Sequence, residues 1–112
     1  MKDLDWVGSS KKDLMEFPEE VRQEIGYALH LAQQGETYNQ TKIFKGYGSG
    51  VYEIVSDHDS NAYRAIYIVN FGDTIYVLHA FQKKSKKGIK TPKEELDVIE
   101  NRLKRLKAML GR

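Results

Sequence analysis

The sequence predicts an α+β fold, because the spacing of its apolar residues changes twice along the chain. Apolar residues recur every three or four positions over residues 10–34, alternate with polar ones in segments between residues 42 and 81, and return to helical spacing after residue 91. Helical segments that flank consecutive strands are typical of helices packed on a sheet. We therefore expect a twisted antiparallel sheet of four to five strands, an N-terminal helical hairpin and a C-terminal helix packed on the sheet.

The N-terminal part of the chain predicts one short strand followed by the helical hairpin. The apolar run of residues 4–7 ends at Gly8 and suits a brief strand. Ser10 is expected to cap the first helix, and Pro18 to restart or kink it. Gly35 stands where a left-handed C-terminal cap belongs, so we expect the helical region to end there.

The middle of the chain predicts four further strands. Each segment is rich in β-branched and aromatic residues and is bounded by turn formers: residues 42–45, 51–55, 63–69 and 74–81. We expect a polar hairpin loop over residues 56–61, and a tighter turn over residues 70–73 in which Gly72 takes a positive φ.

The C-terminal helix has the strongest local signal. Thr91 is the expected N-cap, with Pro92 in the first helical position and Glu94 completing a capping box. An apolar stripe follows at steps of three and four residues, formed by Leu96, Ile99, Leu103, Leu106 and Leu110. We expect this stripe to pack on the sheet, although a stripe this regular also suits a partner protein.

Length and composition predict a single domain over residues 1–112. The chain is 40% apolar and 30% charged, which is typical of a soluble globular protein. It contains no Cys, which excludes a disulfide framework, a thiolate zinc site and thiol catalysis. Because it lacks the apolar run of a signal peptide or a membrane span, we expect a cytoplasmic protein with no membrane contact.

The net charge is only +2, but the charges are unevenly distributed. Residues 83–93 carry six lysines and no acid, whereas the first helical region is acidic through Glu16, Glu19, Glu20 and Glu24. A lysine run is often only a solvated loop. It also suits an anionic partner such as an RNA backbone.

Several short segments, spread over nearly the whole chain, carry a family resemblance. They are WVGSS at residues 6–10, DL at 13–14, FP at 17–18, GVYEI at 50–54, YRAIY at 63–67, VLHAFQKK at 77–84 and TP at 91–92. Together, in this order, they resemble the RelE/ParE toxin superfamily and especially its HigB-like, phage-associated branch. The resemblance implies a RelE-like domain that is produced together with a HigA-like, helix-turn-helix antitoxin. A heterotetramer of the two proteins is one stoichiometry that stays open.

The resemblance also implies an activity. Members of the superfamily typically enter the ribosomal A site and cut the bound messenger RNA without a metal or other cofactor. The 2′-hydroxyl attacks the adjacent phosphate and leaves a 2′,3′-cyclic phosphate and a 5′-hydroxyl. Such a reaction needs a proton acceptor, positive charge at the phosphate and a proton for the leaving oxygen.

Arg64 is the expected source of positive charge. It lies in an otherwise apolar and aromatic strand, where an unpaired guanidinium would be costly, so it must face solvent, a carboxylate or a phosphate. The alternative is a structural salt bridge to Glu53 on the neighbouring strand. Alternation places Arg64 on the face of Ile66 and Ile68, so Arg64 must lie towards the strand end or on a bulge.

Lysines near the predicted strand ends are the other candidates for RNA contact. Lys83 and Lys84 still belong to the end of the last strand and are expected to be catalytic. The remaining lysines are expected to hold the RNA backbone: Lys86, Lys87 and Lys90 from the loop, and Lys42 and Lys45 from the first strand after the helices.

The general acid and base stay open. Many ribosome-dependent relatives carry a Tyr or His near the C-terminus, whereas this chain has no Tyr after residue 76 and no His after residue 79. His79 is a catalytic candidate. Alternation, however, places it on the same face of the sheet as Ile75, Val77 and Phe81, which favours a hydrogen-bonded core histidine. His58, if its loop folds over the groove, and a lysine whose pKa is lowered by neighbouring lysines are further candidates.

Two other functions also stay open. One is gyrase inhibition of the ParE type, which works by surface contact, and the other is an inert binding module that uses the C-terminal stripe. We expect no metal site, because Asp57, His58 and Asp59 are adjacent in one loop and seldom converge on one ion in such an arrangement. Residues 46–50 are glycine-rich but lack the helix and lysine of a nucleotide site.

Overall fold

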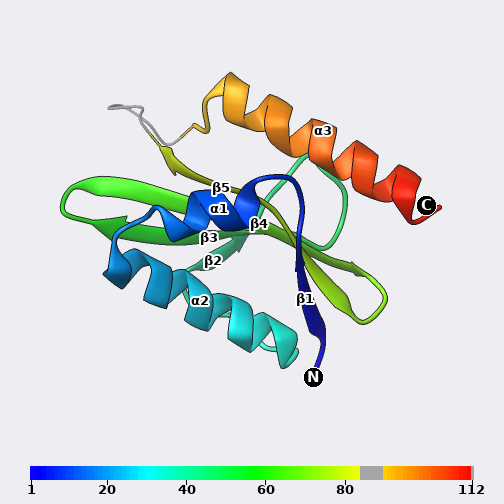
Figure 1. Cartoon of the computed structure of the whole chain (residues 1–112), viewed down its shortest axis with the longest axis horizontal. Helices are drawn as coiled ribbons and strands as arrows, with labels where there is room; N and C mark the ends of the chain where they lie inside the picture. The colour runs from blue at the N-terminus through cyan, green and yellow to red at the C-terminus, as the bar shows by residue number, and fades with distance from the viewer. Residues whose placement is uncertain (84–89, 112) are drawn as a thin grey trace.

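The computed structural model describes residues 1–83 and 90–111, which form a five-stranded sheet with helices on both faces (Figure 1). The elements are, in chain order, β1 (Asp3–Trp6), α1 (Ser10–Met15), α2 (Glu19–Gln33), β2 (Thr41–Ile43), β3 (Val51–His58), β4 (Asn61–Phe71), β5 (Thr74–Lys83) and α3 (Lys93–Met109). The expected α+β fold is confirmed. No helix in the described part of the chain is long and apolar enough to cross a membrane.

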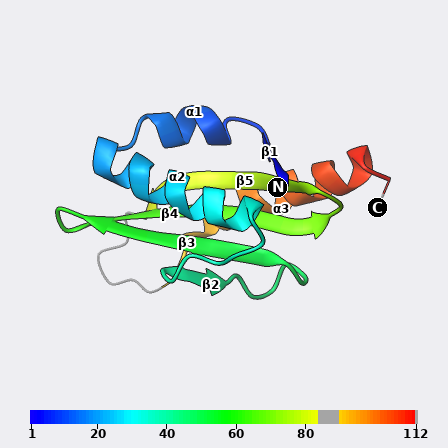
Figure 2. The ribbon, with the colours of Figure 1, turned by 90° about the horizontal axis from the view of Figure 1, so that it is seen from below.

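The strand order in the sheet is β1-β5-β4-β3-β2. Strands β2 to β5 are antiparallel neighbours, whereas β1 pairs with β5 in parallel, with Asp3 aligned to Thr74 and Trp6 to Val77. After β1 the chain crosses one face of the sheet through α1 and α2 before it enters β2 at the opposite edge (Figure 2). This crossover lets β1 pair with β5 in parallel at the edge opposite β2, so the sheet is mixed.

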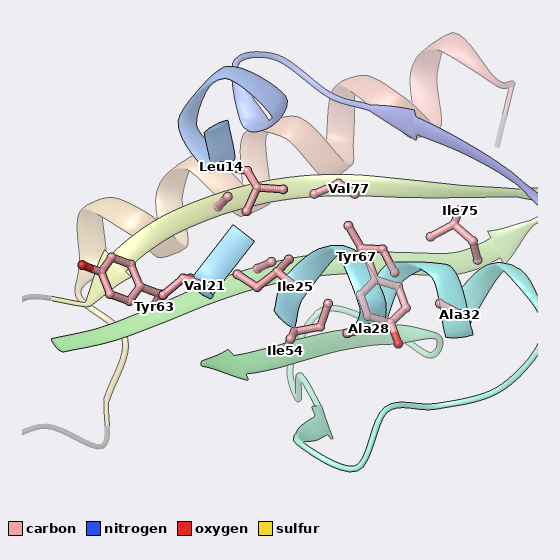
Figure 3. Close-up of a cluster of buried hydrophobic side chains, with 13 residues drawn as sticks. Leu14, Val21, Ile25, Ala28, Ala32, Ile54, Tyr63, Tyr67, Ile75 and Val77 are labelled. Carbon is pink, nitrogen blue, oxygen red and sulfur yellow. The ribbon is translucent and has the colours of Figure 1, made fainter. Parts of the chain in front are cut away.

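Two hydrophobic clusters lie on opposite faces of the sheet. Figure 3 shows the cluster beneath α1 and α2, where Leu14 and Ile25 pack over Tyr67 and Val77 of the sheet. The other cluster lies beneath α3, and Ile99, Leu103 and Leu106 are buried in it, as the apolar stripe predicts. At the end of that stripe Leu110 is 38% exposed. The C-terminal helix therefore uses most of its apolar stripe within the chain.

The expected polar loop over residues 56–61 is wrong, because the hairpin is tighter than its composition suggests. Strand β3 continues to His58 and β4 begins at Asn61, so only Asp59 and Ser60 form the turn. Both have positive φ, 50° and 65°. Two consecutive left-handed residues give the turn a twist that matches the flanking strands, so pairing continues to the last residue.

The helix starts also differ from the expected caps. The N-cap of α1 is Ser9, and Ser10 is instead buried, where its Oγ donates to the carbonyl of Val77 at 3.1 Å. The N-cap of α3 is Pro92, and no side-chain capping bond forms there. The expected capping box of Thr91 and Glu94 is therefore wrong. The positive φ expected for the glycines at positions 35 and 72 is confirmed, at 82° and 67°.

A β-bulge in β5 changes which of its side chains share a face. Ile66 of β4 lies opposite His79, but Tyr67 lies opposite Val77, so Leu78 is an extra residue without a partner of its own. Val77 faces the α1 and α2 cluster, whereas His79 lies on the α3 face. The expectation that His79 shares a face with Val77 is wrong, because strict alternation stops at the bulge.

The tight hairpin gives a first prediction. Ser60 has a side chain at φ 65°, a conformation that costs most residues about 1 kcal/mol and costs glycine much less. We expect Ser60→Gly to raise the free energy of unfolding by up to about 1 kcal/mol. Urea unfolding followed by circular dichroism measures the change. An unchanged or lower midpoint would contradict the turn geometry.

Candidate functional site

Five charged side chains gather on the α3 face of the sheet, near the β3–β4 hairpin. They come from four neighbouring strands and are Lys42 of β2, Glu53 and Asp57 of β3, Arg64 of β4 and Lys83 of β5, which we call the Arg64 cluster. The register places Lys42 opposite Glu53, Arg64 opposite Phe81 and Lys83 opposite Ala62. Alternation along each strand then turns all five side chains to one face.

Arg64 is buried, with 8% of its surface exposed, and two carboxylates hold it. Its Nη1 donates to Asp57 Oδ1 at 3.1 Å and to the carbonyl of Tyr63 at 2.9 Å. Its Nε lies 3.5 Å from Glu53 Oε2, an ion pair without hydrogen-bond geometry. The salt bridge to Glu53 is therefore present. Among the described residues, Nη2 of Arg64 has no hydrogen bond and keeps its donor capacity for a ligand.

Lys83 is also buried, at 8% exposure. Burial lowers the pKa of its amine, and the charge of Arg64 lowers it further, while Glu53 acts in the opposite direction. The neutral form of this amine is therefore populated at a lower pH than in an ordinary lysine. A neutral amine beside a cation can accept a proton from a bound hydroxyl.

Three of the expected RNA-binding lysines line one groove beside the Arg64 cluster. This β2–α3 groove has a volume of about 650 Å³ and runs between the β2–β3 loop and the start of α3. Lys42, Lys45 and Lys90 are exposed in it, and Glu53 links it to Arg64. Lys84, Lys86 and Lys87 lie outside the described residues.

His79 is a buried, hydrogen-bonded histidine between β5 and α3. Its Nε2 lies 2.7 Å from Glu95 Oε1 and its Nδ1 lies 3.3 Å from Arg102 Nη1. Because arginine only donates, Nδ1 must accept, which assigns the proton to Nε2 and makes Glu95 its acceptor. Burial lowers the pKa of His79 and Arg102 acts in the same direction, against Glu95. The neutral ring therefore ties α3 to the sheet.

The other histidines lie away from the Arg64 cluster. His58 Nε2 is 3.3 Å from Asp59 and 3.9 Å from Glu20 of α2. The alternative in which His58 reaches the groove is not realised, because alternation turns it to the α2 face while Asp57 faces Arg64. His30 is exposed on α2. In residues 1–83 and 90–111, no three His, Cys, Asp or Glu side chains converge in a way that could hold a metal ion.

The sequence interpretation missed Arg102, which connects three elements. Its Nη1 donates to the carbonyl of Leu78 at 2.9 Å, and its Nη2 donates to Ser9 Oγ at 2.9 Å. Ser9 in turn donates to Asp13 of α1 at 2.8 Å. A Cβ at Gly8 would lie 2.7 Å from Arg102 Nε, so the glycine makes room for the guanidinium. The available signal was a glycine before a helix, together with an arginine beside an apolar stripe.

Residues 12–104 match the family described as "Phage derived protein Gp49-like (DUF891)". The chain belongs to this Gp49-like family. No curated protein matches it. Among solved structures, the Gp49-like chain is similar to a chain of the toxin–antitoxin complex RelBE2 from Mycobacterium tuberculosis. The TM-score is 0.52 at 13% identity, over 75% of this chain and 93% of that chain. This likeness shows the fold, so the expected RelE-like architecture is confirmed.

The neutral state of His79 gives a second prediction. Because its folded pKa is lowered, the unfolded chain binds a proton first as the pH falls below the ordinary histidine pKa of about 6.5. We expect the free energy of unfolding to fall from about pH 7.5 to about pH 5. In His79→Gln, whose amide can replace both hydrogen bonds without titrating, this decline should be smaller. Urea unfolding at each pH measures it, and identical slopes would contradict a neutral, buried His79.

Proposed function

We propose that this protein is the HigB-like toxin of a toxin–antitoxin system and cleaves messenger RNA on the ribosome without a metal. The observation that carries the proposal is the side-by-side burial of Arg64 and Lys83 on neighbouring strands, at the edge of a lysine-lined groove. The fold shared with a chain of a toxin–antitoxin complex supports it. The proposed partners are a HigA-like antitoxin, the ribosome and the messenger, in the cytoplasm.

In the proposed reaction, the neutral amine of Lys83 takes the proton of a ribose 2′-hydroxyl. The 2′-oxygen then bonds to the adjacent phosphorus and the bond from phosphorus to the 5′-oxygen breaks, which leaves a 2′,3′-cyclic phosphate. Arg64 donates from Nη2 to a phosphate oxygen where negative charge accumulates. Lys84 is proposed to protonate the departing 5′-oxygen.

The contacts of the cluster explain why these groups suit these roles. Glu53 and Asp57 hold Arg64 through Nε and Nη1 and so position it without occupying Nη2. Both ring nitrogens of His79 are engaged by Glu95 and Arg102, which favours Lys83 over His79 as the base. The lysines of the groove, with Lys86 and Lys87, are proposed to hold the RNA backbone.

Expression in a bacterium, followed by primer extension on total RNA, tests the activity. The proposal predicts growth arrest and cuts confined to translated regions. An SOS response with intact messages would instead indicate gyrase inhibition of the ParE type. No growth effect from a folded protein made without its antitoxin would contradict both toxin activities.

Two variants separate the proposed role of Arg64 in cleavage from its role in the salt bridge to Glu53. We expect Arg64→Gln to lower cleavage by about 100-fold or more, because a donor to the transition state is lost. It should also cost about 3 kcal/mol of unfolding free energy, because buried Glu53 loses its partner. In Glu53→Gln/Arg64→Gln the stability should return while cleavage stays low. If cleavage returned with stability, Arg64 would be only structural.

The role of Lys83 is tested by its pH dependence. A base with a lowered pKa predicts a cleavage rate that rises with pH and levels off below the pKa of an ordinary lysine. We expect Lys83→Arg to keep the charge but lose most of the activity and this rise, as measured with purified ribosomes and a defined messenger. Lys11→Arg, at an exposed position of α1, is the matched control. A fully active Lys83→Arg enzyme would assign the base elsewhere.

A further inference from the structure

The β2–α3 groove contains an aromatic pair that the proposed reaction does not use. Tyr47 of the β2–β3 loop stacks on Phe44, with ring centroids 5.2 Å apart and ring planes at 25°. Phe44 is buried, whereas Tyr47 is only partly buried and lines the groove. Phe44 therefore supports one face of the tyrosine ring, and part of Tyr47 stays accessible from the groove.

The loop that carries Tyr47 is shaped by three glycines and held by the side chain of Asn70. Gly46, Gly48 and Gly50 take φ of 97°, 92° and 78°, a region that favours glycine. The side chain of Asn70 donates to both the carbonyl and the hydroxyl of Ser49, at 2.7 and 2.8 Å. A Cβ at Gly50 would lie 2.5 Å from the Asn70 side chain. These glycines do not form a phosphate loop; they allow the tight path of the loop that presents Tyr47, and the hydrogen bonds from Asn70 hold it.

The charges that line the groove suit a nucleic-acid backbone. Lys42, Lys45 and Lys90 are exposed there. The two lining carboxylates each lie beside a cation, with Glu53 3.5 Å from Arg64 and Glu100 4.0 Å from Lys104. Cationic side chains beside an accessible aromatic ring are typical of surfaces that bind single-stranded nucleic acid. The groove volume of about 650 Å³ is within the range of small-molecule sites.

We propose that the β2–α3 groove binds one nucleotide of single-stranded RNA, with its base stacked on Tyr47 and its backbone held by Lys42, Lys45 and Lys90. This inference deepens the proposed function and rests on it, since it assigns the messenger as the ligand. Glu53 lines the groove and contacts Arg64, so the stacked base belongs to a nucleotide close to the phosphate that is attacked. Tyr47 is then a binding residue rather than a proton donor.

The test uses a short, fully 2′-O-methylated single-stranded RNA, which cannot be cleaved because it has no 2′-hydroxyl. Binding to the full-length protein is measured by fluorescence anisotropy. We expect Tyr47→Leu, which keeps apolar contact with Phe44, to weaken binding about tenfold, and Tyr47→Phe to bind like the unchanged protein. Tyr27→Leu removes an exposed tyrosine on α2 and should have no effect. Thermal melting checks that each variant is folded.

A second probe needs no variant. The same RNA with one abasic position should bind the unchanged protein about tenfold more weakly when that position matches the stacked base. It should bind Tyr47→Leu no more weakly than the complete RNA does. Full affinity in Tyr47→Leu, an equal loss in Tyr47→Phe, no effect of any abasic position, or no RNA binding by the unchanged protein would each overturn the inference.

Failure of this inference is distinguishable from failure of the proposed function. Cleavage of translated messages in cells with full RNA affinity in Tyr47→Leu would keep the ribonuclease and remove the stacking site. Tyr47-dependent binding of the methylated RNA without cleavage in cells would keep the site and remove the ribonuclease.

Discussion

The extra residue Leu78 in β5 brings Lys83 into the Arg64 cluster. Before the bulge, Ile75 and Val77 face α1 and α2, and without it the later odd-numbered residues would do the same. The bulge shifts the alternation by one residue, so His79 and Lys83 lie on the α3 face instead. The contact between β5 and α3 and the position of Lys83 on the face of Arg64 both depend on this shift.

The electrostatics of the cluster follow from burying two cations side by side. A buried guanidinium needs carboxylate partners, and Glu53 and Asp57 provide them from the adjacent strand. Burial lowers the pKa of Lys83, and the same positive charge that would stabilise a phosphate lowers it further. In the proposed reaction, a proton acceptor and a phosphate-binding group can therefore arise from the electrostatic effect of Arg64 on Lys83. The reaction proposed for the cluster therefore needs no tyrosine or histidine near the C-terminus.

Much of the fold was predictable, because periodicity reports burial directly. All five strands, both N-terminal helices and the α3 stripe follow from spacing, and uninterrupted alternation in β4 placed Arg64 on the correct face. Alternation failed in β5, since no residue type marks a bulge at Leu78. The turn at Asp59 and Ser60 was also hidden, because neither residue is the glycine that such a turn favours. Tyr47 was not predicted as a binding residue, because the family resemblance directs attention to a Tyr or His near the C-terminus.

The parallel pairing of β1 with β5 also affects how the chain is made. Asp3 and Thr74 are aligned although 71 positions separate them (74 minus 3), so β1 leaves the ribosome long before its partner strand exists. Contacts of such large sequence separation form late in folding. The first strand must wait while α1 and α2 form, and the sheet closes only once β5 has emerged. Because Lys83 is the last residue of β5, no truncated chain that ends before it contains the whole Arg64 cluster.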